Sequence, residues 1–146
     1  MVVSSDDRLF YLITETQRVL MAHLKDRLHQ EGVRLSPAQA GLLFLLIQRD
    51  GRTMTEVSRL LYADNSSISR LVDRMENTGW VSREREAQDR RAIVLRISDQ
   101  GRKEAAKARD IVRMVNEEIK ACLEPEEAEV FKKILRRLTR TYQRDP

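Results

Sequence analysis

The sequence predicts a mainly α-helical fold of the α+β class. Several segments carry apolar residues at steps of three and four, and most of them begin at a recognisable capping residue. Between Trp80 and Ile97 the pattern changes to the alternation of two short strands. With 146 residues, the chain fits one domain, or one body with two small lobes.

The first helix is predicted to follow Ser4 or Ser5 and to run to about Gln30, because Gly32 then ends it. One apolar stripe runs along its whole length. The stripe consists of Leu9, Ile13, Thr16, Leu20, Leu24 and Leu28, widened by Phe10, Val19 and Met21.

Three further helices have clear starting signals. In SPAQ, Ser36 is the expected N-cap and Gln39 closes a capping box; in TMTE, Thr53 and Glu56 play the same parts. Asp64 is the expected cap of the next segment. The corresponding stops are Asp50-Gly51, the Tyr62-Ala63 pair and Gly79. The last two helices, joined by about three residues, form a helix-turn-helix pattern.

A hairpin follows, with strands from Trp80 to about Glu86 and from Ile93 to Ile97. We expect Ile93, Leu95 and Ile97 to anchor it on the helices, on a different face from Val81, Arg83 and Arg85. Its tip, Asp89-Arg90-Arg91, lacks glycine. Asp89 can organise the turn by binding either Arg91 or the backbone N–H groups.

Two long helices complete the chain. Ser98 caps one that runs to about Leu123, and Pro125 starts the last. Ile111, Val115, Ile119 and Cys122 form a stripe on the first, so Cys122 is predicted to be a packed thiol rather than a sensor. On the last helix the inward residues are Val130 or Phe131, Ile134 or Leu135, Leu138 and Tyr142. Long terminal helices with little core between them indicate a partner chain.

The helix after Asp64 carries the strongest functional pattern. Small polar residues open it, and Ser66, Arg70 and Arg74 share one face because they are four apart. A helix start offers N–H groups to phosphate, and arginines one turn further can reach guanine edges. An ordinary solvated face with locally paired arginines is the alternative. The capped helix before it and the hairpin after it favour DNA, with the basic hairpin tip suited to a minor groove.

Composition narrows the class of partner. The formal net charge is +4 and the pI is about 9.5, a basic excess that permits nucleic-acid binding. Aromatic residues make up only 5%, which argues against a base-stacking surface for RNA or single strands.

The apolar run Ala40 to Ile47 is too short to span a bilayer. The N-terminus lacks a signal-peptide layout, and the single cysteine suits a reducing cytoplasm.

No enzyme, cofactor or metal pattern is present in the sequence. The glycines are scattered rather than gathered in a phosphate loop, and Ser66, Ser67 and Ser69 have no nearby histidine or lysine in sequence to act as a base. His23 and His29 point away from each other on a helix. We therefore predict a protein that is not an enzyme and holds no cofactor or metal.

The order of motifs resembles the MarR family of winged helix-turn-helix transcriptional regulators. The resemblance rests on the SxxSR-type helix start, TGWVSRERE, the tip DRR, the strand IVLRIS and SDQGR, and is strongest from Thr53 to Arg102. It implies a homodimer with intertwined terminal helices, at residues 6–30 and 99–142. It also implies a major-groove helix and a wing that places Arg91, steadied by Asp89, in or near the minor groove. Arg70 stands where family members have a base-contacting arginine.

The sequence departs from the family in three places. Tyr62 replaces a small residue in the helix-turn-helix turn, Glu124 stands where a serine cap is usual, and the first helix has no oxidant-sensing cysteine. Some relatives bind small phenolic or anionic ligands, for which Arg18, His23, Phe44 and Trp80 are conceivable lining groups, although each is better explained as core or interface.

The interpretation is therefore a homodimeric, cytoplasmic repressor that binds a pseudo-palindromic double-stranded DNA operator and responds to a small phenolic or anionic effector. The DNA-binding region is 36–98, and residues 1–35 and 99–146 form the dimerisation region. The predicted DNA-binding residues are Asn65, Ser66, Ser67, Ser69, Arg70, Arg74, Asp89, Arg90 and Arg91. The alternative is a winged-helix module that binds a protein partner through the same face, supported by Asp73, Glu84 and Glu86.

Overall fold

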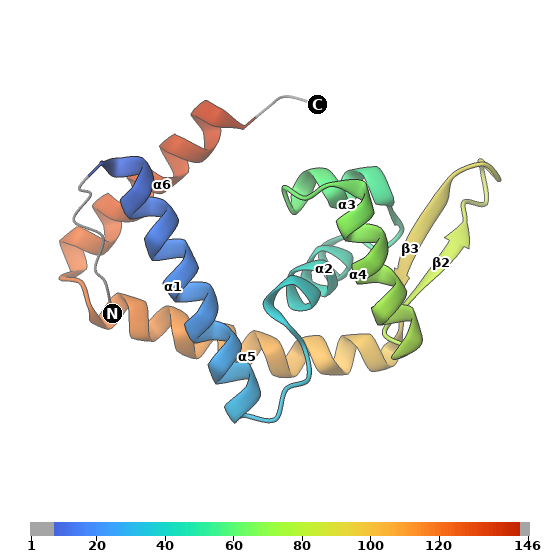
Figure 1. Cartoon of the computed structure of the whole chain (residues 1–146), viewed down its shortest axis with the longest axis horizontal. Coiled ribbons are helices and arrows are strands. Elements are labelled where there is room, and N and C mark those ends of the chain that lie inside the picture. Colours follow the sequence, from blue (N-terminus) through green and yellow to red (C-terminus); the bar gives the residue numbers. More distant parts are fainter. Residues whose placement is uncertain (1–7, 144–146) are drawn as a thin grey trace. The chain divides into compact units, whose positions relative to one another are not determined.

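The computed structural model describes residues 8–143, which form helices and one small antiparallel sheet (Figure 1). This confirms the predicted mainly α, winged-helix architecture. In chain order the elements are α1 (Leu9–Gln30), α2 (Pro37–Gln48), β1 (Arg52–Thr53), α3 (Met54–Leu60), α4 (Asn65–Asn77), β2 (Val81–Arg85), β3 (Ile93–Ile97), α5 (Asp99–Ala121) and α6 (Pro125–Tyr142). The predicted start of the first helix, after Ser4 or Ser5, lies outside the described residues.

The chain forms two compact units, one ending at Ile111 and the other beginning at Val112, so α5 belongs to both. The first unit holds α1 to α4, the sheet and the first half of α5. The second holds the rest of α5 and α6. The division into a DNA-binding region, 36–98, and a dimerisation region stays a prediction.

The predicted capping residues start the central helices. Ser36 Oγ accepts from the Gln39 N–H at 3.2 Å, and Gln39 Oε1 accepts from the Ser36 N–H at 2.9 Å. The same reciprocal pair joins Thr53 and Glu56, at 3.2 and 2.8 Å. Such boxes satisfy N–H groups that a helix start leaves unpaired. The helix-turn-helix is therefore fixed at its starts by local contacts.

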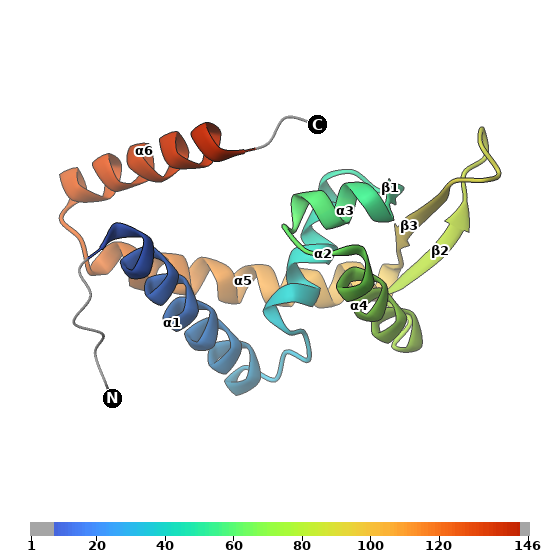
Figure 2. The same cartoon turned by 45° about the horizontal axis from the view of Figure 1, so that its top comes forward.

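The sheet has three strands in the order β1-β3-β2, so the sequence reading missed β1, which pairs Arg52 with Leu95 (Figure 2). The register also corrects the expected faces. Arg83 lies directly opposite Leu95 and Val81 opposite Ile97, and directly opposed residues share one face of a sheet. The arginines and the apolar residues of the hairpin therefore do not lie on separate faces.

The hairpin anchor differs from the predicted one at its outer end. Ile93 is 47% exposed, whereas Val94 is buried together with Leu95 and Ile97. Because side chains alternate along a strand, Val94 lies on the other face from Leu95. Both faces of β3 are therefore covered near the helices, while the strand is open near the tip.

Asp50 holds the base of the hairpin, a role that the sequence reading missed because it took Asp50-Gly51 only as a helix stop. Helix α2 already ends at Gln48. Asp50 Oδ1 accepts from the Ile97 N–H at 3.0 Å, and the Gly51 N–H donates to the Leu95 carbonyl at 3.0 Å. These bonds tie the end of α2 to β3.

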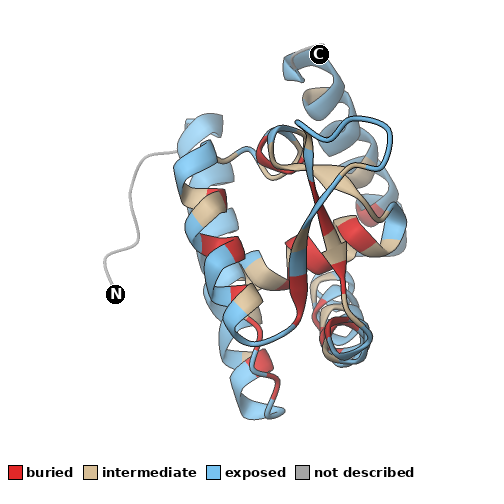
Figure 3. Ribbon diagram, turned by 90° about the vertical axis from the view of Figure 1, so that its right-hand side faces the viewer, coloured by how far each residue is buried: buried red, intermediate tan, exposed pale blue. Residues whose placement is uncertain are grey.

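The core of the first unit lies between α2, α4, the hairpin base and the first half of α5 (Figure 3). Its fully buried side chains include Leu42, Leu43, Leu46, Val57, Val72, Met75 and Leu95. Gly101 lets α5 approach closely, because a Cβ there would collide with the Trp80 carbonyl oxygen. Each helix of the described residues is too short or too polar to span a bilayer.

The terminal helices expose much of their apolar surface in the single chain. On α1 only Leu28 is buried, while Leu9 and Phe10 are 77% and 75% exposed. On α6 the stripe predicted to face inward is exposed as well, at Val130, Phe131, Ile134, Leu135 and Tyr142. Cys122, predicted to be packed, is exposed, and its thiol donates to the Glu118 carbonyl at 3.4 Å. The stripe that contains Cys122 extends along α5 beyond Ile111, the last residue of α5 that belongs to the core.

Candidate nucleic-acid interface

Helix α4 has three distinct sides, set by its sequence pattern. The inner side, Ile68, Leu71, Val72 and Met75, is buried in the core. This burial fixes the helix rotation about its axis, because the apolar residues recur at steps of three and four. The remaining residues are therefore held either outward or toward the hairpin.

The outward side of α4 carries Ser66, Arg70, Arg74 and Asn77, all exposed. Within residues 8–143, no hydrogen bond or ion pair engages the side chain of Arg70 or Arg74. The alternative reading, in which these arginines are paired with neighbours, therefore does not hold for either. Both guanidinium groups keep all of their donors for a ligand.

The first turn of α4 is organised by Asp64. Its carboxylate accepts from the Ser67 N–H and from the hydroxyls of Ser66 and Ser67, at 2.8, 2.5 and 2.8 Å respectively. The Ser66 hydroxyl, followed by the Ser67 N–H and hydroxyl, holds the pKa of Asp64 well below its usual range. Ser66 and Ser67, both predicted to contact DNA, are therefore drawn toward a carboxylate. The sequence identified Asp64 as a helix cap, but not as the acceptor of hydrogen bonds from the Ser66 and Ser67 hydroxyls.

The third side of α4 faces the hairpin and grips Arg83. The Arg83 guanidinium donates to Asp73 at 2.8 Å and to Glu76, and its N–H donates to Glu76 Oε1 at 3.0 Å. It also reaches the Ser69 carbonyl and hydroxyl at 3.3 and 3.4 Å. Arg83 is thus a clamp between α4 and β2 rather than a free basic group toward the tip.

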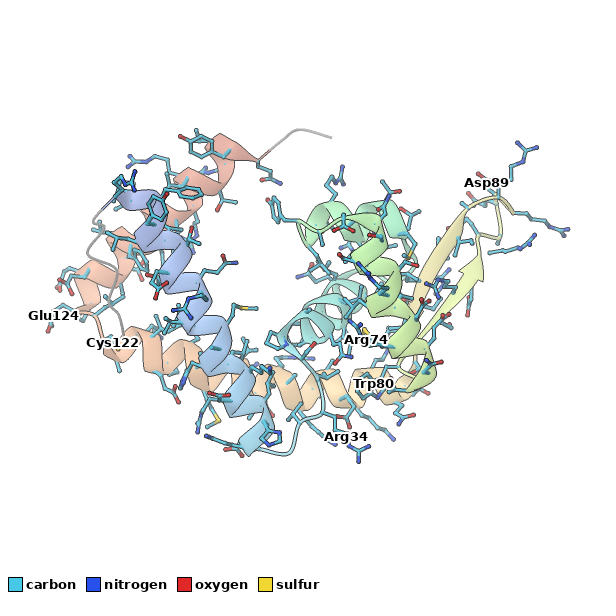
Figure 4. All side chains as sticks on the ribbon, viewed as in Figure 1. Arg34, Arg74, Trp80, Asp89, Cys122 and Glu124 are labelled. Atoms are coloured by element: carbon cyan, nitrogen blue, oxygen red, sulfur yellow. The ribbon has the colours of Figure 1, made fainter. Side chains whose placement is uncertain are left out.

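The hairpin tip is shaped by Asp89, as expected for a turn without glycine. Asp89 Oδ1 accepts from the Arg91 N–H at 3.0 Å, and its carbonyl accepts from the Ala92 N–H at 3.0 Å. Of the two alternatives for Asp89, the structure has the bond to the backbone. In residues 8–143 the Arg90 and Arg91 guanidiniums have no protein partner and are exposed. Figure 4 shows Asp89 at the far end of the hairpin.

The predicted site residues thus fall into two groups on one compact unit. Asn65, Ser66, Ser67, Arg70 and Arg74 lie at the start and on the outer side of α4, and Asp89, Arg90 and Arg91 lie at the tip. Ser69 lies between them, turned toward Arg83. The arrangement offers two separate basic surfaces joined by the clamp. Contact of these residues with DNA stays a prediction.

Two sequence departures have clear local geometry. Tyr62 has φ +52°, the left-handed conformation that favours glycine, and its side chain is 76% exposed. At the start of α6, Glu127 accepts from the Glu124 N–H at 2.9 Å. This bond joins the Glu124 backbone to the Glu127 side chain, so it does not depend on a serine at position 124. Neither departure disrupts the fold.

Within residues 8–143, no group of three or more His, Cys, Asp or Glu side chains could hold a metal ion. Among the lining groups considered for an effector, Arg18 is exposed and paired with Glu15 at 2.6 Å, and Trp80 is buried. A cavity of about 570 Å³ lies beside Trp80 and is also lined by Arg34 and Arg74.

Comparisons with known proteins agree with this geometry. A family model described as the MarR family matches residues 35–92, from the loop before α2 to the hairpin tip. The chain is 26% identical over 104 residues to the HTH-type transcriptional regulator YdgJ of Bacillus subtilis (strain 168), covering 71% of this chain and 63% of that protein, which is less than two thirds of its length. It is 26% identical over 120 residues to the HTH-type transcriptional regulator BilQ of Clostridium symbiosum (strain WAL-14163), covering 80% of each.

A solved structure of the transcriptional repressor CouR, bound to a 23-mer DNA duplex, has the same fold, with a TM-score of 0.84 and 23% identity. The match covers 95% of this chain and 99% of that one. The fold, the family model and the named relatives lead to one conclusion: the chain has a winged helix-turn-helix fold, its residues 35–92 match the MarR family, and the proteins that it resembles are transcriptional regulators.

Proposed function

We propose that the protein is a homodimeric repressor that binds a pseudo-palindromic double-stranded DNA operator. The observation that carries the proposal is the pair of basic surfaces on one unit: Arg70 and Arg74 on α4, and Arg90 and Arg91 at the hairpin tip. In residues 8–143 none of these four side chains has a partner within the chain. The solved CouR structure, which has this fold and holds a DNA duplex, supports the same assignment.

In this proposal α4 enters the major groove and the hairpin tip lies along the minor groove. Arg70, exposed on the outer side of α4, can form a bidentate contact with a guanine edge. Arg90 and Arg91 supply positive charge that a narrow minor groove attracts. Of the two, Arg91 is assigned to the groove. Asn65 and the Ser66 backbone lie at the helix start, where N–H groups suit a phosphate.

The dimer is proposed from the exposed apolar surface of the terminal helices. Leu9, Phe10 and Ile13 on α1, and Phe131 and Leu135 on α6, are each 40% or more exposed. On each helix taken by itself, an exposed apolar stripe marks an interaction surface. A second copy of the chain would cover it and would set two α4 helices about 34 Å apart, one helical turn of DNA.

Two variants test the assigned roles. Arg70→Ala should weaken binding by about 1–3 kcal/mol and relax base preference, while Arg91→Ala should weaken binding to all duplexes more evenly. Titrations on selected and scrambled duplexes measure both effects. An unchanged ratio between selected and scrambled duplexes in Arg70→Ala contradicts the role given to Arg70.

Salt dependence separates this function from the protein-interaction alternative. Binding through several phosphates should lose orders of magnitude in affinity between about 50 and about 200 mM salt. The absence of duplex binding at low salt, for any sequence in a random pool, would instead favour a protein partner on the same face.

A further inference from the structure

We propose that Tyr62 is a further DNA contact, and that its hydroxyl donates a hydrogen bond to a backbone phosphate beside the start of α4. The proposal rests on the repressor function above, because it names a residue that helps to hold α4 in its groove. Tyr62 belongs to neither of the two basic surfaces already described.

Tyr62 closes the end of α3. Its N–H donates to the Arg59 carbonyl at 3.2 Å, and the Ala63 N–H donates to the Ser58 carbonyl at 3.0 Å. This pair of bonds needs a residue in the left-handed conformation directly after the helix, a position that glycine usually takes. Tyr62 has φ +52°, and within residues 8–143 it is the only residue other than glycine with a positive φ. Backbone geometry alone therefore does not favour tyrosine here.

The side chain of Tyr62 makes no contact within the chain that would explain this strain. It is 76% exposed, and in the part of the chain that the structure describes neither its ring nor its hydroxyl has a bonding partner. Strained residues gather at binding and catalytic sites, where the side chain serves a partner. The strain and the exposure together point to a contact outside the chain.

The position of Tyr62 favours DNA as the partner. Tyr62 lies in the turn between α3 and α4, two residues before Asp64, the N-cap of α4. In a helix-turn-helix the first helix crosses the DNA backbone while the second lies in the major groove. The turn that joins the two helices therefore lies beside phosphates when α4 enters the groove.

The charged residues next to this turn in sequence fit a phosphate. Arg59, in the last turn of α3, is exposed, and its guanidinium has no partner within residues 8–143. Asp64 is the nearest acid in sequence, but its carboxylate accepts from Ser66 and Ser67. A phosphate beside the turn thus meets a positive charge from Arg59 and a neutral phenol donor from Tyr62.

Tyr62→Phe is the first test, because it removes the hydroxyl and keeps the ring and the Cβ. Duplex binding should weaken about tenfold, the loss expected for one hydrogen bond to a charged group. Selected and scrambled duplexes should lose affinity equally, since phosphates carry no sequence information. The salt dependence should stay as in the wild-type protein, because no charge is removed. Tyr142→Phe makes the same change at an exposed tyrosine of α6 and should leave duplex affinity unchanged.

Tyr62→Gly separates the contact from folding. Glycine takes a positive φ without strain, so this variant should be at least as stable as the wild-type protein in urea unfolding. It also lacks the hydroxyl and should bind duplexes no more tightly than Tyr62→Phe. Weaker DNA binding by a protein that is no less stable is not explained by loss of the fold.

Arg59→Gln tests whether a phosphate lies beside the turn. It should weaken binding to every duplex and reduce the slope of log affinity against log salt by about one. An unchanged slope overturns the proposal, because the phosphate that Tyr62 is assigned to is then absent from this place.

The outcomes separate this contact from the repressor function. Equal duplex binding by Tyr62→Phe and the wild-type protein overturns the contact and leaves the repressor function standing. A loss confined to selected duplexes also overturns it, since the hydroxyl would then read a base. If the wild-type protein binds no duplex at low salt, the repressor function fails and the contact fails with it.

Discussion

At the scale of the residue, Tyr62 adopts a backbone conformation that glycine normally takes. Its φ of +52° brings Cβ close to the backbone, which costs a residue with a side chain about 1–2 kcal/mol. The ring is 76% exposed, so its packing offsets little of this strain. The backbone strain at Tyr62 therefore lowers the stability of the turn between α3 and α4, and a residue without a Cβ would relieve that strain.

Tyr62→Gly should raise the free energy of unfolding by about 1 kcal/mol, because glycine adopts positive φ without strain. Urea unfolding of the purified protein measures the change. Tyr62→Ala is the matched control, since it removes the ring but keeps a Cβ, and it should give no such gain. Equal stability of the Gly and Ala variants would mean that backbone strain is not the reason.

Sequence reasoning worked best for residues whose partners are near in the chain. The caps Ser36, Thr53 and Asp64 each bind a group three residues on, and Asp89 binds a group two residues on. Such contacts follow from local geometry. Arg83 was misplaced because its partners, Asp73 and Ser69, lie ten and fourteen residues away, where only the folded hairpin brings them together.

At the scale of the element, the Arg83 clamp fixes the hairpin to α4. A two-stranded hairpin is marginal alone and needs support from other elements. Here β1 extends the sheet, Asp50 ties the hairpin base to the end of α2, and Arg83 ties β2 to the side of α4. The strand β1 escaped the sequence because two residues, Arg52 and Thr53, are too few to show a period.

Arg83→Gln should lower the free energy of unfolding by about 1–3 kcal/mol, because it removes charged hydrogen bonds and leaves Asp73 and Glu76 without their cation. It should also weaken binding to every duplex, since the hairpin is then no longer fixed to α4. Arg85→Gln is the control on the same strand, exposed and without an ion pair in residues 8–143. Urea unfolding and duplex titration give the two readouts.

A double-mutant cycle with Asp73→Asn sharpens this test. Residues in contact should show a coupling energy of about 0.5 kcal/mol or more, whereas independent sites add. Additive effects of Arg83→Gln and Asp73→Asn would show that the ion pair does not hold the hairpin.

At the scale of the whole molecule, both terminal helices expose more large apolar side chains than a helix surrounded by solvent normally does. Sequence patterning placed an apolar stripe on α6 and predicted it to face inward, but in the single chain the stripe is exposed, because a single sequence does not say what covers it. In the single chain Phe131 is 43% and Leu135 40% exposed. The dimer proposal accounts for the stripe, because a partner copy supplies the missing contacts.

Phe131→Glu should convert the dimer to a species of 17.1 kDa, since burying an unpaired carboxylate costs several kcal/mol. Sedimentation equilibrium measures the mass. Lys133→Glu places the same carboxylate on the opposite side of α6 and should leave the dimer intact. A monomeric wild-type protein, or equal masses for the two variants, would contradict the proposed interface.

The three sides of α4 limit how operator preference can change over evolutionary time. One side is committed to the core and a second, through Ser69, Asp73 and Glu76, is committed to Arg83. Substitutions on either of these sides destabilise the fold and do not change the surface that is proposed to contact DNA. Under the proposed function, new preferences can therefore arise mainly on the outer side, at Arg70 and Arg74.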